Sequence, residues 1–246
     1  MEWFRRYWTK IVFFATIVLS WEFLVDNFII PTPSDILSQF FFILSKVRTW
    51  ENILASMQKV YVSLAVAIMI GLLIGSLRYF YPKIAEYVDS IFYPSQFIAS
   101  AVWTLIAIVL FGLSWVTPYF IIIMVILPNL FVAVQIGLKN VNKQLLEFGH
   151  SITRHKGRLF RYIIFPQVMP PFFMGIIRSN AIAWKIVVTA EIFIGTNGLG
   201  FMVNNYYRLI NIPKLFATVL LIIIIGLSMD YLFRQIHRRY FTYDNN

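Results

Sequence analysis

Three ionisable side chains, Arg178, Lys185 and Glu191, lie in one long apolar run at about 168–194. Charges inside a membrane are costly and usually serve a function such as substrate binding. Arg178 and Lys185 are seven residues apart and share a helix face, and Glu191 follows near the end of the run. Lys185 could therefore meet an anionic substrate, or it could pair with Glu22, with Asp26 or with a backbone carbonyl.

Two tryptophans add a second possible kind of binding. Trp103 and Trp184 could line a cavity for an aromatic or heterocyclic ligand. Aromatic side chains are abundant in this chain, however, which favours packing against lipid or in the core for each tryptophan. The sequence leaves both interpretations open.

A basic, polar island at about 139–166 separates two apolar runs, with Arg154, Lys156, Arg158 and Arg161 preceding Pro166. Apolar residues alternate with these charges, a pattern typical of short amphipathic helices lying across the inner face of a membrane. Such helices can rest on anionic lipid or fill a groove of a soluble protein subunit. We interpret the island as a cytoplasmic segment and keep both possibilities.

Several kinds of chemistry are not expected of this chain. It has no GxxxxGK[ST] loop, so it cannot hydrolyse ATP by that route. It has no cysteine, which excludes disulfides, thiolate metal sites and cysteine catalysis. Glu147 and His150 form a single Glu-x-x-His, whereas di-iron bundles use two copies, so we expect no metal site. We expect neither an enzyme nor a cofactor in this chain.

Hydropathy predicts an all-α membrane protein with six spans. Hydrophobic residues make up 59% of the chain and the mean hydropathy is +0.73. A helix needs ~20 apolar residues to cross ~30 Å of hydrocarbon. The apolar runs that approach this length lie at about 11–30, 53–77, 94–113, 118–138, 168–194 and 214–233. We expect one membrane domain over 1–246, and the first run lacks the cleavage site of a signal peptide.

The basic residues predict the topology. The net charge of +10 could suggest nucleic acid, but most Lys and Arg fall in segments that would share one side of the membrane. The positive-inside rule then places both termini and the island in the cytoplasm, and no nucleic-acid partner is expected. Gly71 and Gly75 are spaced for close helix contact in lipid, either within the chain or with another subunit.

Short motifs follow one another in a fixed order along the chain. They are Trp21-Glu22, Pro31-Thr32-Pro33-Ser34-Asp35, Phe111-Gly112-Leu113-Ser114, Gly175-Ile176-Ile177-Arg178, Trp184, Glu191, Gly198-Leu199-Gly200 and the ending Met229-Asp230 to Arg238-Arg239. This series resembles the permease subunits of bacterial ABC importers of the nitrate, sulfonate and taurine type, a group that also includes thiamine-precursor permeases. The island resembles their coupling loop, with Glu147 in the Glu position, Phe148-Gly149 for Ala-Ala, Thr153 for Gly and Phe165-Pro166 for Leu-Pro.

The resemblance implies the MetI-like fold of type I importers in a multi-pass protein of the bacterial cell membrane. It implies ATPase subunits that bind ATP and Mg, an extracytoplasmic substrate-binding protein and a second permease copy, expected to be identical in sequence because homodimers are usual in the family. The substrate stays open among sulfonate, nitrate, thiamine precursor and similar solutes. A stand-alone secondary transporter or a membrane scaffold is the alternative.

The resemblance also assigns roles to residues. The residues expected to dock the ATPase are Glu147, Phe148, Gly149, Thr153, Arg154, Lys156, Leu159, Phe160, Arg161 and Pro166. Within this set, we expect Glu147 to orient the loop by local hydrogen bonds, and Leu159 and Phe160 to fill a groove of the ATPase. The candidates for the substrate path are Trp103, Arg178, Trp184, Lys185 and Glu191, of which Arg178 and Glu191 occupy family positions and are expected to pair within or between helices.

Overall fold

The computed structural model describes residues 16, 20–22 and 30–241, and this part of the chain is helical without a β-strand. The elements are α2 (Pro33–Leu44), α3 (Val47–Phe80), α4 (Pro82–Ser95), α5 (Ser100–Phe111), α6 (Val116–Lys139), α7 (Lys143–Ile152), α8 (Lys156–Leu159), the π-helix η1 (Phe160–Ile164), α9 (Phe165–Ile194), α10 (Leu199–Arg208) and α11 (Ile212–Phe241). The all-α class predicted from hydropathy is confirmed.

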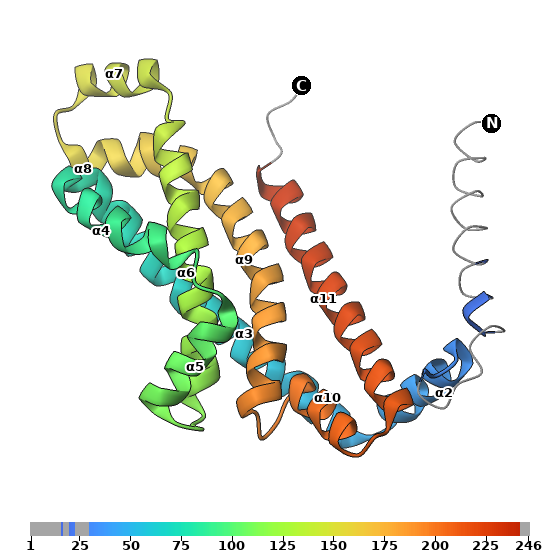
Figure 1. The fold of residues 1–246 in the computed structure, drawn as a ribbon. Helices are drawn as coiled ribbons and strands as arrows, with labels where there is room; N and C mark the ends of the chain where they lie inside the picture. The colour runs from blue at the N-terminus through green and yellow to red at the C-terminus, as the bar shows by residue number, and fades with distance from the viewer. Residues whose placement is uncertain (1–15, 17–19, 23–29, 242–246) are drawn as a thin grey trace, which may run out of the picture.

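The core of the bundle forms where α6 packs along both α3 and α9 (Figure 1). On α6, Ile121, Ile122, Ile126 and Leu130 are fully buried, so this helix is apolar on the sides that face its neighbours. About 56% of the apolar window of α6 is buried, against 17% for α11. Most of α11 is therefore left for lipid or for another protein chain.

Two glycines on α3 permit the close approach of α6. A Cβ at Gly75 would lie 2.3 Å from a methyl carbon of Val134, and one at Gly71 would lie 3.2 Å from the Cβ of Leu130. Small residues four apart allow helix backbones to approach each other in this way. The sequence left open whether Gly71 and Gly75 contact another helix of this chain or another subunit. The structure shows that they contact a helix of the same chain.

The predicted spans are found in part. Four described helices are long and apolar enough to cross a membrane, at Val47–Leu77, Val116–Lys139, Lys156–Ile194 and Ile212–Arg239. The span expected at 94–113 is wrong as a straight helix, because Glu86–Ser95 and Ser100–Phe111 meet at a bend of 104°. Pro94, which lacks a backbone N–H, lies just before this break. The run expected at 11–30 lies almost wholly outside the described residues.

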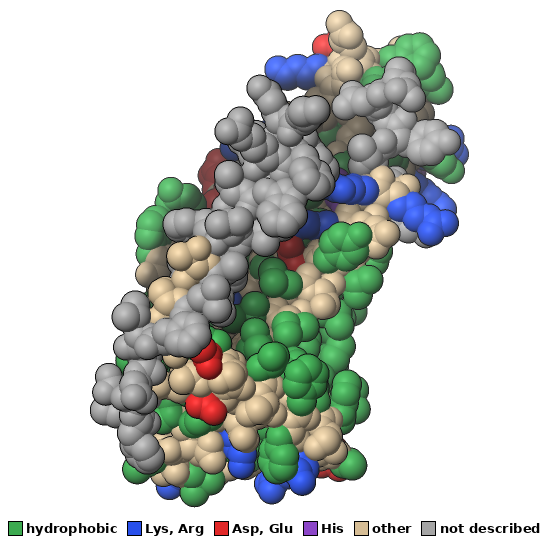
Figure 2. Space-filling model, turned by 90° about the vertical axis from the view of Figure 1, so that its right-hand side faces the viewer, with side chains coloured by type: hydrophobic (Ala, Val, Ile, Leu, Met, Phe, Trp, Pro, Cys, Tyr) green, Lys and Arg blue, Asp and Glu red, His purple; other side chains and the backbone are tan. Residues whose placement is uncertain are grey.

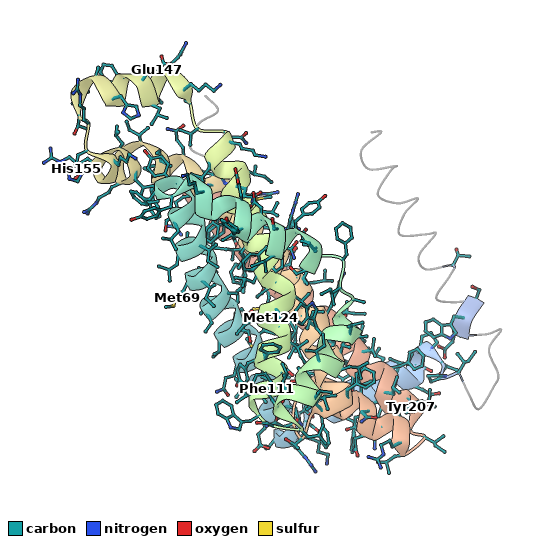
Figure 3. All side chains as sticks on the ribbon, turned by 60° about the vertical axis from the view of Figure 1, so that its left-hand side comes forward. Met69, Phe111, Met124, Glu147, His155 and Tyr207 are labelled. Atoms are coloured by element: carbon teal, nitrogen blue, oxygen red, sulfur yellow. The ribbon has the colours of Figure 1, made fainter. Side chains whose placement is uncertain are left out.

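The two ends of the bundle carry different parts of the chain. Glu147 and His155 lie at one end, and Phe111 and Tyr207 lie at the other (Figure 3). The last described turns of α11 lie at the same end as α7, which agrees with the prediction that the island and the C-terminal end share one side (Figure 1). Figure 2 shows apolar side chains over the middle of one face, with Lys and Arg mainly toward the two ends. We call the end with α7 the inner end and the other the outer end.

Candidate functional site

The island folds into α7, α8 and η1, two short α-helices and a π-helical turn that leads directly into α9. The first turn of α7 is capped by Asn142, whose Oδ1 accepts the N–H groups of Gln144 (2.9 Å) and Leu145 (3.2 Å). Gln167 on α9 accepts the Asn142 N–H (2.8 Å) and donates to the carbonyl of Ile163 (2.9 Å). These polar contacts fix the start of α7 to α9, and sequence reasoning missed them.

The helix α7 has two apolar sides, and only one of them is covered. Gly149 is buried against the following turns, where a Cβ would lie 2.2 Å from the Cδ1 of Ile163. On the other side, Leu145, Phe148 and Ile152 are 49%, 64% and 70% exposed. Their spacing of three and four residues places them in one row. We call these three residues the coupling stripe.

Two residues expected in the docking surface lie elsewhere. Leu159 is only 1% exposed, under α7. The ring of Phe160 packs inward, with its centroid 5.5 Å from Tyr79, 5.3 Å from Phe80 and 6.2 Å from Phe165. The expectation that Leu159 fills an ATPase groove is therefore wrong, because its side chain is buried under α7, whereas Phe160 is half-buried and packs against α3.

The other predicted island residues stay at the surface or at helix ends. Arg154, Lys156 and Arg161 are exposed, and Pro166 is exposed near the start of α9. Thr153 ends α7 in extended backbone with φ −148°, a conformation that needs no glycine. Its Oγ1 accepts the His155 N–H (3.2 Å).

Glu147 does not act as expected. Its carboxylate is exposed and makes no hydrogen bond to any described residue, so the predicted orienting bond is wrong. The Asn142 cap and Gln167 provide that orientation instead. Among the described residues, no cluster of three or more His, Asp or Glu side chains could hold a metal ion.

The helix α9 exposes both of its predicted cations. Arg178 lines a groove of about 280 Å³ between α6 and α9, and Lys185 lines one of about 490 Å³ between α9 and α11. Neither cation has a hydrogen bond or ion pair with a described residue, so the expectation that Arg178 pairs is wrong within the described part of the chain. Both cations are therefore exposed on α9, and neither is paired with a residue in the described part of the chain.

The groove between α9 and α11, the α9–α11 groove, holds further polar groups. Trp184 lines it and is 4% exposed. Asp230 accepts a hydrogen bond from the Nε of Arg234 (2.6 Å), and its second carboxylate oxygen is without a partner in the described structure. Trp103 lies on α5 and packs against Phe120 (6.5 Å between ring centroids), apart from this groove.

Glu191, the fifth path candidate, lies in a buried polar cluster near the outer end. Its side chain has no exposed surface, and its Oε1 accepts the ammonium of Lys59 on α3 at 2.8 Å. Both carboxylate oxygens lie 2.9 Å from the Ser56 hydroxyl, and Oε2 accepts the Gly200 N–H at 2.9 Å. Glu191 thus pairs between helices, as expected.

The same face of α3 binds the turn between α9 and α10, residues 197–200, which we call the outer turn. The contacts are Gly198 N–H to Asn52 Oδ1 (2.7 Å), Leu199 N–H to Ser56 Oγ (2.8 Å), and Lys59 Nζ to the carbonyl and side-chain oxygens of Asn197 (both 2.9 Å). Sequence reasoning missed the α3 residues. Their spacing of four and three residues, which places them on one helix face, was the available signal.

A pocket of about 200 Å³ lies beside the outer turn, lined by residues of α2, α3 and α10 that include Lys46, Arg48 and Tyr206. Burial raises the pKa of Tyr206, and the positive charge of Arg48 opposes this shift. The ammonium groups of Lys46 and Lys214 both lie over the ring of Phe42, at 4.6 and 5.1 Å. The outer surface is therefore basic at this point.

Known proteins resemble the chain over most of its length. The profile of the "Binding-protein-dependent transport system inner membrane component" family matches residues 67–242. The taurine transport system permease protein TauC of Escherichia coli (strain K12) is 20% identical over 221 residues, which cover 88% of this chain and 80% of TauC. The putative aliphatic sulfonates transport permease protein SsuC of Bacillus subtilis (strain 168) is 22% identical, covering 98% of this chain and 90% of SsuC.

Among solved structures, a chain of the MetNI methionine ABC transporter in an inward-facing conformation matches with a TM-score of 0.69. The match has 16% sequence identity and covers 81% of this chain and 97% of that chain. At this identity the match shows the fold alone, and it confirms the predicted MetI-like architecture. The chain is an ABC transporter permease, a multi-pass inner-membrane protein, and it belongs to the family of binding-protein-dependent transport system inner membrane components.

Proposed function

We propose that this chain is the permease subunit of an ATP-driven importer for a small solute that an extracytoplasmic binding protein delivers. Two permease copies, expected to be identical, would form the membrane path. Separate ATPase subunits that bind ATP and Mg would dock on α7 at the inner end. The coupling stripe is the observation that carries this proposal.

The stripe needs a partner because it is apolar and lies beside exposed basic residues. Leu145, Phe148 and Ile152 form a row on a short helix whose opposite side is already packed. An amphipathic helix of this kind fits an apolar groove of another protein. Anionic lipid is the competing partner, since the nearby Arg154 and Lys156 would also favour a lipid surface.

The exposed cations of α9 support a path for anions. A charge facing lipid is costly, so a side of α9 with Arg178 and Lys185 is better explained by a water-filled or protein-lined cavity. Lys185 also lines the α9–α11 groove, which has a volume of about 490 Å³. We infer that Lys185 attracts an anionic solute there. TauC and SsuC, by name, transport taurine and aliphatic sulfonates.

A stand-alone transporter would need a free carboxylate at mid-membrane for ion coupling. Glu191 already accepts hydrogen bonds from Lys59, Ser56 and a backbone N–H. It is therefore poorly suited to carry a coupling ion, and the importer is the better proposal.

The test is affinity purification of the tagged chain in mild detergent, with the variant Phe148→Asp purified in parallel. The bound proteins are identified by mass spectrometry, and ATP hydrolysis is measured. We expect an ATPase with the wild type in a fixed ratio and its loss with the variant. If the wild type is reproducibly free of any ATPase, the importer proposal is wrong.

A further inference from the structure

The contacts between α3 and the outer turn leave no polar group of the cluster unused. An ammonium has three protons to donate. Those of Lys59 are taken by Glu191 and by the two oxygens of Asn197. Glu191 in turn accepts from Ser56 and from a backbone N–H of the turn. We call Asn52, Ser56, Lys59 and Glu191 the outer clamp.

The outer clamp is resistant to opening because its charges are buried. The side chain of Glu191 is fully buried, and that of Lys59 is 10% exposed. Separating such a pair leaves an unpaired charge away from water, which is far more costly than separating an ion pair at the surface. A transport cycle that opened the clamp would have to meet this cost at every turnover.

The backbone of the outer turn fits against Glu191 without spare room. Gly198 has φ +113°, a conformation that favours glycine, and a Cβ there would lie 2.0 Å from a carboxylate oxygen of Glu191. At Gly200, a Cβ would lie 2.3 Å from the carbonyl oxygen of Val188. The turn therefore has little freedom to shift along the clamp.

We propose that Asn52, Ser56 and Lys59 are positioning residues for transport, which lock the outer turn, α10 and the outer end of α9 to α3 as one rigid body. This inference rests on the proposed function, because such a body matters only if the bundle alternates between two states. Opening and closing then occur at other contacts, such as the α9–α11 groove.

The rigid body gives the inner end a mechanical connection to the outer surface. The helical segment Lys156–Ile194 runs through the bundle without a break, from the island below α7 to Glu191 in the clamp. A displacement of α7 is carried along α9, and the clamp passes it to α10. Without the clamp, α9 would move and α10 would lag behind it.

The test uses pulsed electron paramagnetic resonance, for which the chain is well suited because it contains no cysteine. Spin labels are placed at Leu54→Cys on α3 and Tyr207→Cys on α10, where the native side chains are 65% and 68% exposed. The full complex in lipid nanodiscs is measured without nucleotide and after trapping with ATP and vanadate, and loss of ATP hydrolysis verifies the trapping. We expect the same label separation in both states.

The same measurement is made with Asn52→Ala/Ser56→Ala, which removes two polar side chains of the clamp together with their hydrogen bonds to the outer turn and to Glu191. Thr218→Ala is the matched control, because Thr218 is a buried hydroxyl on α11 that bonds only within its own helix. The clamp variant should broaden the distribution of distances between the two spin labels. In proteoliposomes, which enclose a compartment for uptake, the clamp variant should also raise the ATP hydrolysed per imported solute about fivefold or more, within the usual range of coupling effects. The Thr218→Ala control should change neither the label distances nor the ATP hydrolysed per solute. If the double variant fails to fold, Asn52→Ala alone is used in its place.

Two results would overturn the inference: a label separation that changes on trapping in the wild type, or a clamp variant that leaves both the separation and the ATP ratio unchanged. If the wild-type complex showed no ATP-driven uptake, the proposed function would fail. The comparison of label separations between wild type and clamp variant would still decide whether the clamp holds α10 to α3.

Discussion

The coupling stripe gives a prediction with a definite size. Phe148 is 64% exposed, so docking can bury about two-thirds of its side chain. Full burial of such a side chain is worth about 1.5–3 kcal/mol, which leaves about 1–2 kcal/mol for this contact. Phe148→Ala should therefore weaken the binding of the ATPase subunit about 5–30-fold, because 1.4 kcal/mol is tenfold in affinity. The fold of the permease should hardly change, since the residue is at the surface.

The matched variant is Leu159→Ala, in the same loop but buried. Leu159 is 1% exposed, and its truncation should destabilise the chain by about 2–5 kcal/mol through the cavity it leaves. The assay titrates the ATPase subunit onto each purified permease and measures its melting temperature without the ATPase. Phe148→Ala should lower affinity and keep the melting temperature, whereas Leu159→Ala should lower the melting temperature. Wild-type affinity in a well-folded Phe148→Ala would refute docking through the stripe.

Three further variants test other contacts. Gly149→Leu should displace α7, because a Cβ there lies 2.2 Å from Ile163, and ATP hydrolysis should continue with little uptake; uptake at the wild-type rate would contradict this. Gly75→Leu should lower the melting temperature in detergent through overpacking against α6, worth about 1–3 kcal/mol, and an unchanged temperature would argue against that contact. Lys185→Met should raise the KM for an anionic solute about tenfold or more, because a hydrogen bond to a charged group contributes about that much to binding. The control Lys83→Met, at an exposed lysine on α4, should leave the KM unchanged. Equal KM values for the two variants would remove the argument for an anionic solute.

Hydropathy and charge predicted the broad architecture because they report directly on the membrane. The runs that became α3, α6, α9 and α11 are continuous and apolar, and their lengths exceed what a span needs. Counting apolar residues could not detect the 104° bend between α4 and α5, because a bent pair of helices has the same apolar content as one straight helix. Pro94 was the only local signal for that break.

The candidate site was predicted less completely because it depends on contacts between distant residues. Lys59 and Glu191 are 132 residues apart in sequence, and nothing in their neighbourhoods says that they meet. In the island, the alternation of apolar and basic residues predicted amphipathic helices but not which side would be covered. Leu159 and Phe160 were taken for surface residues, yet α7 covers Leu159, and Phe160 is half-buried against α3.

Solute uptake is measured into proteoliposomes that contain the purified permease and its co-purified ATPase, with the binding protein added outside. For an ATP-driven importer we expect uptake that requires ATP inside the vesicles and falls sharply with Phe148→Asp. Uptake by the permease alone, without ATP or ATPase, would contradict this expectation and identify a transporter that works by itself.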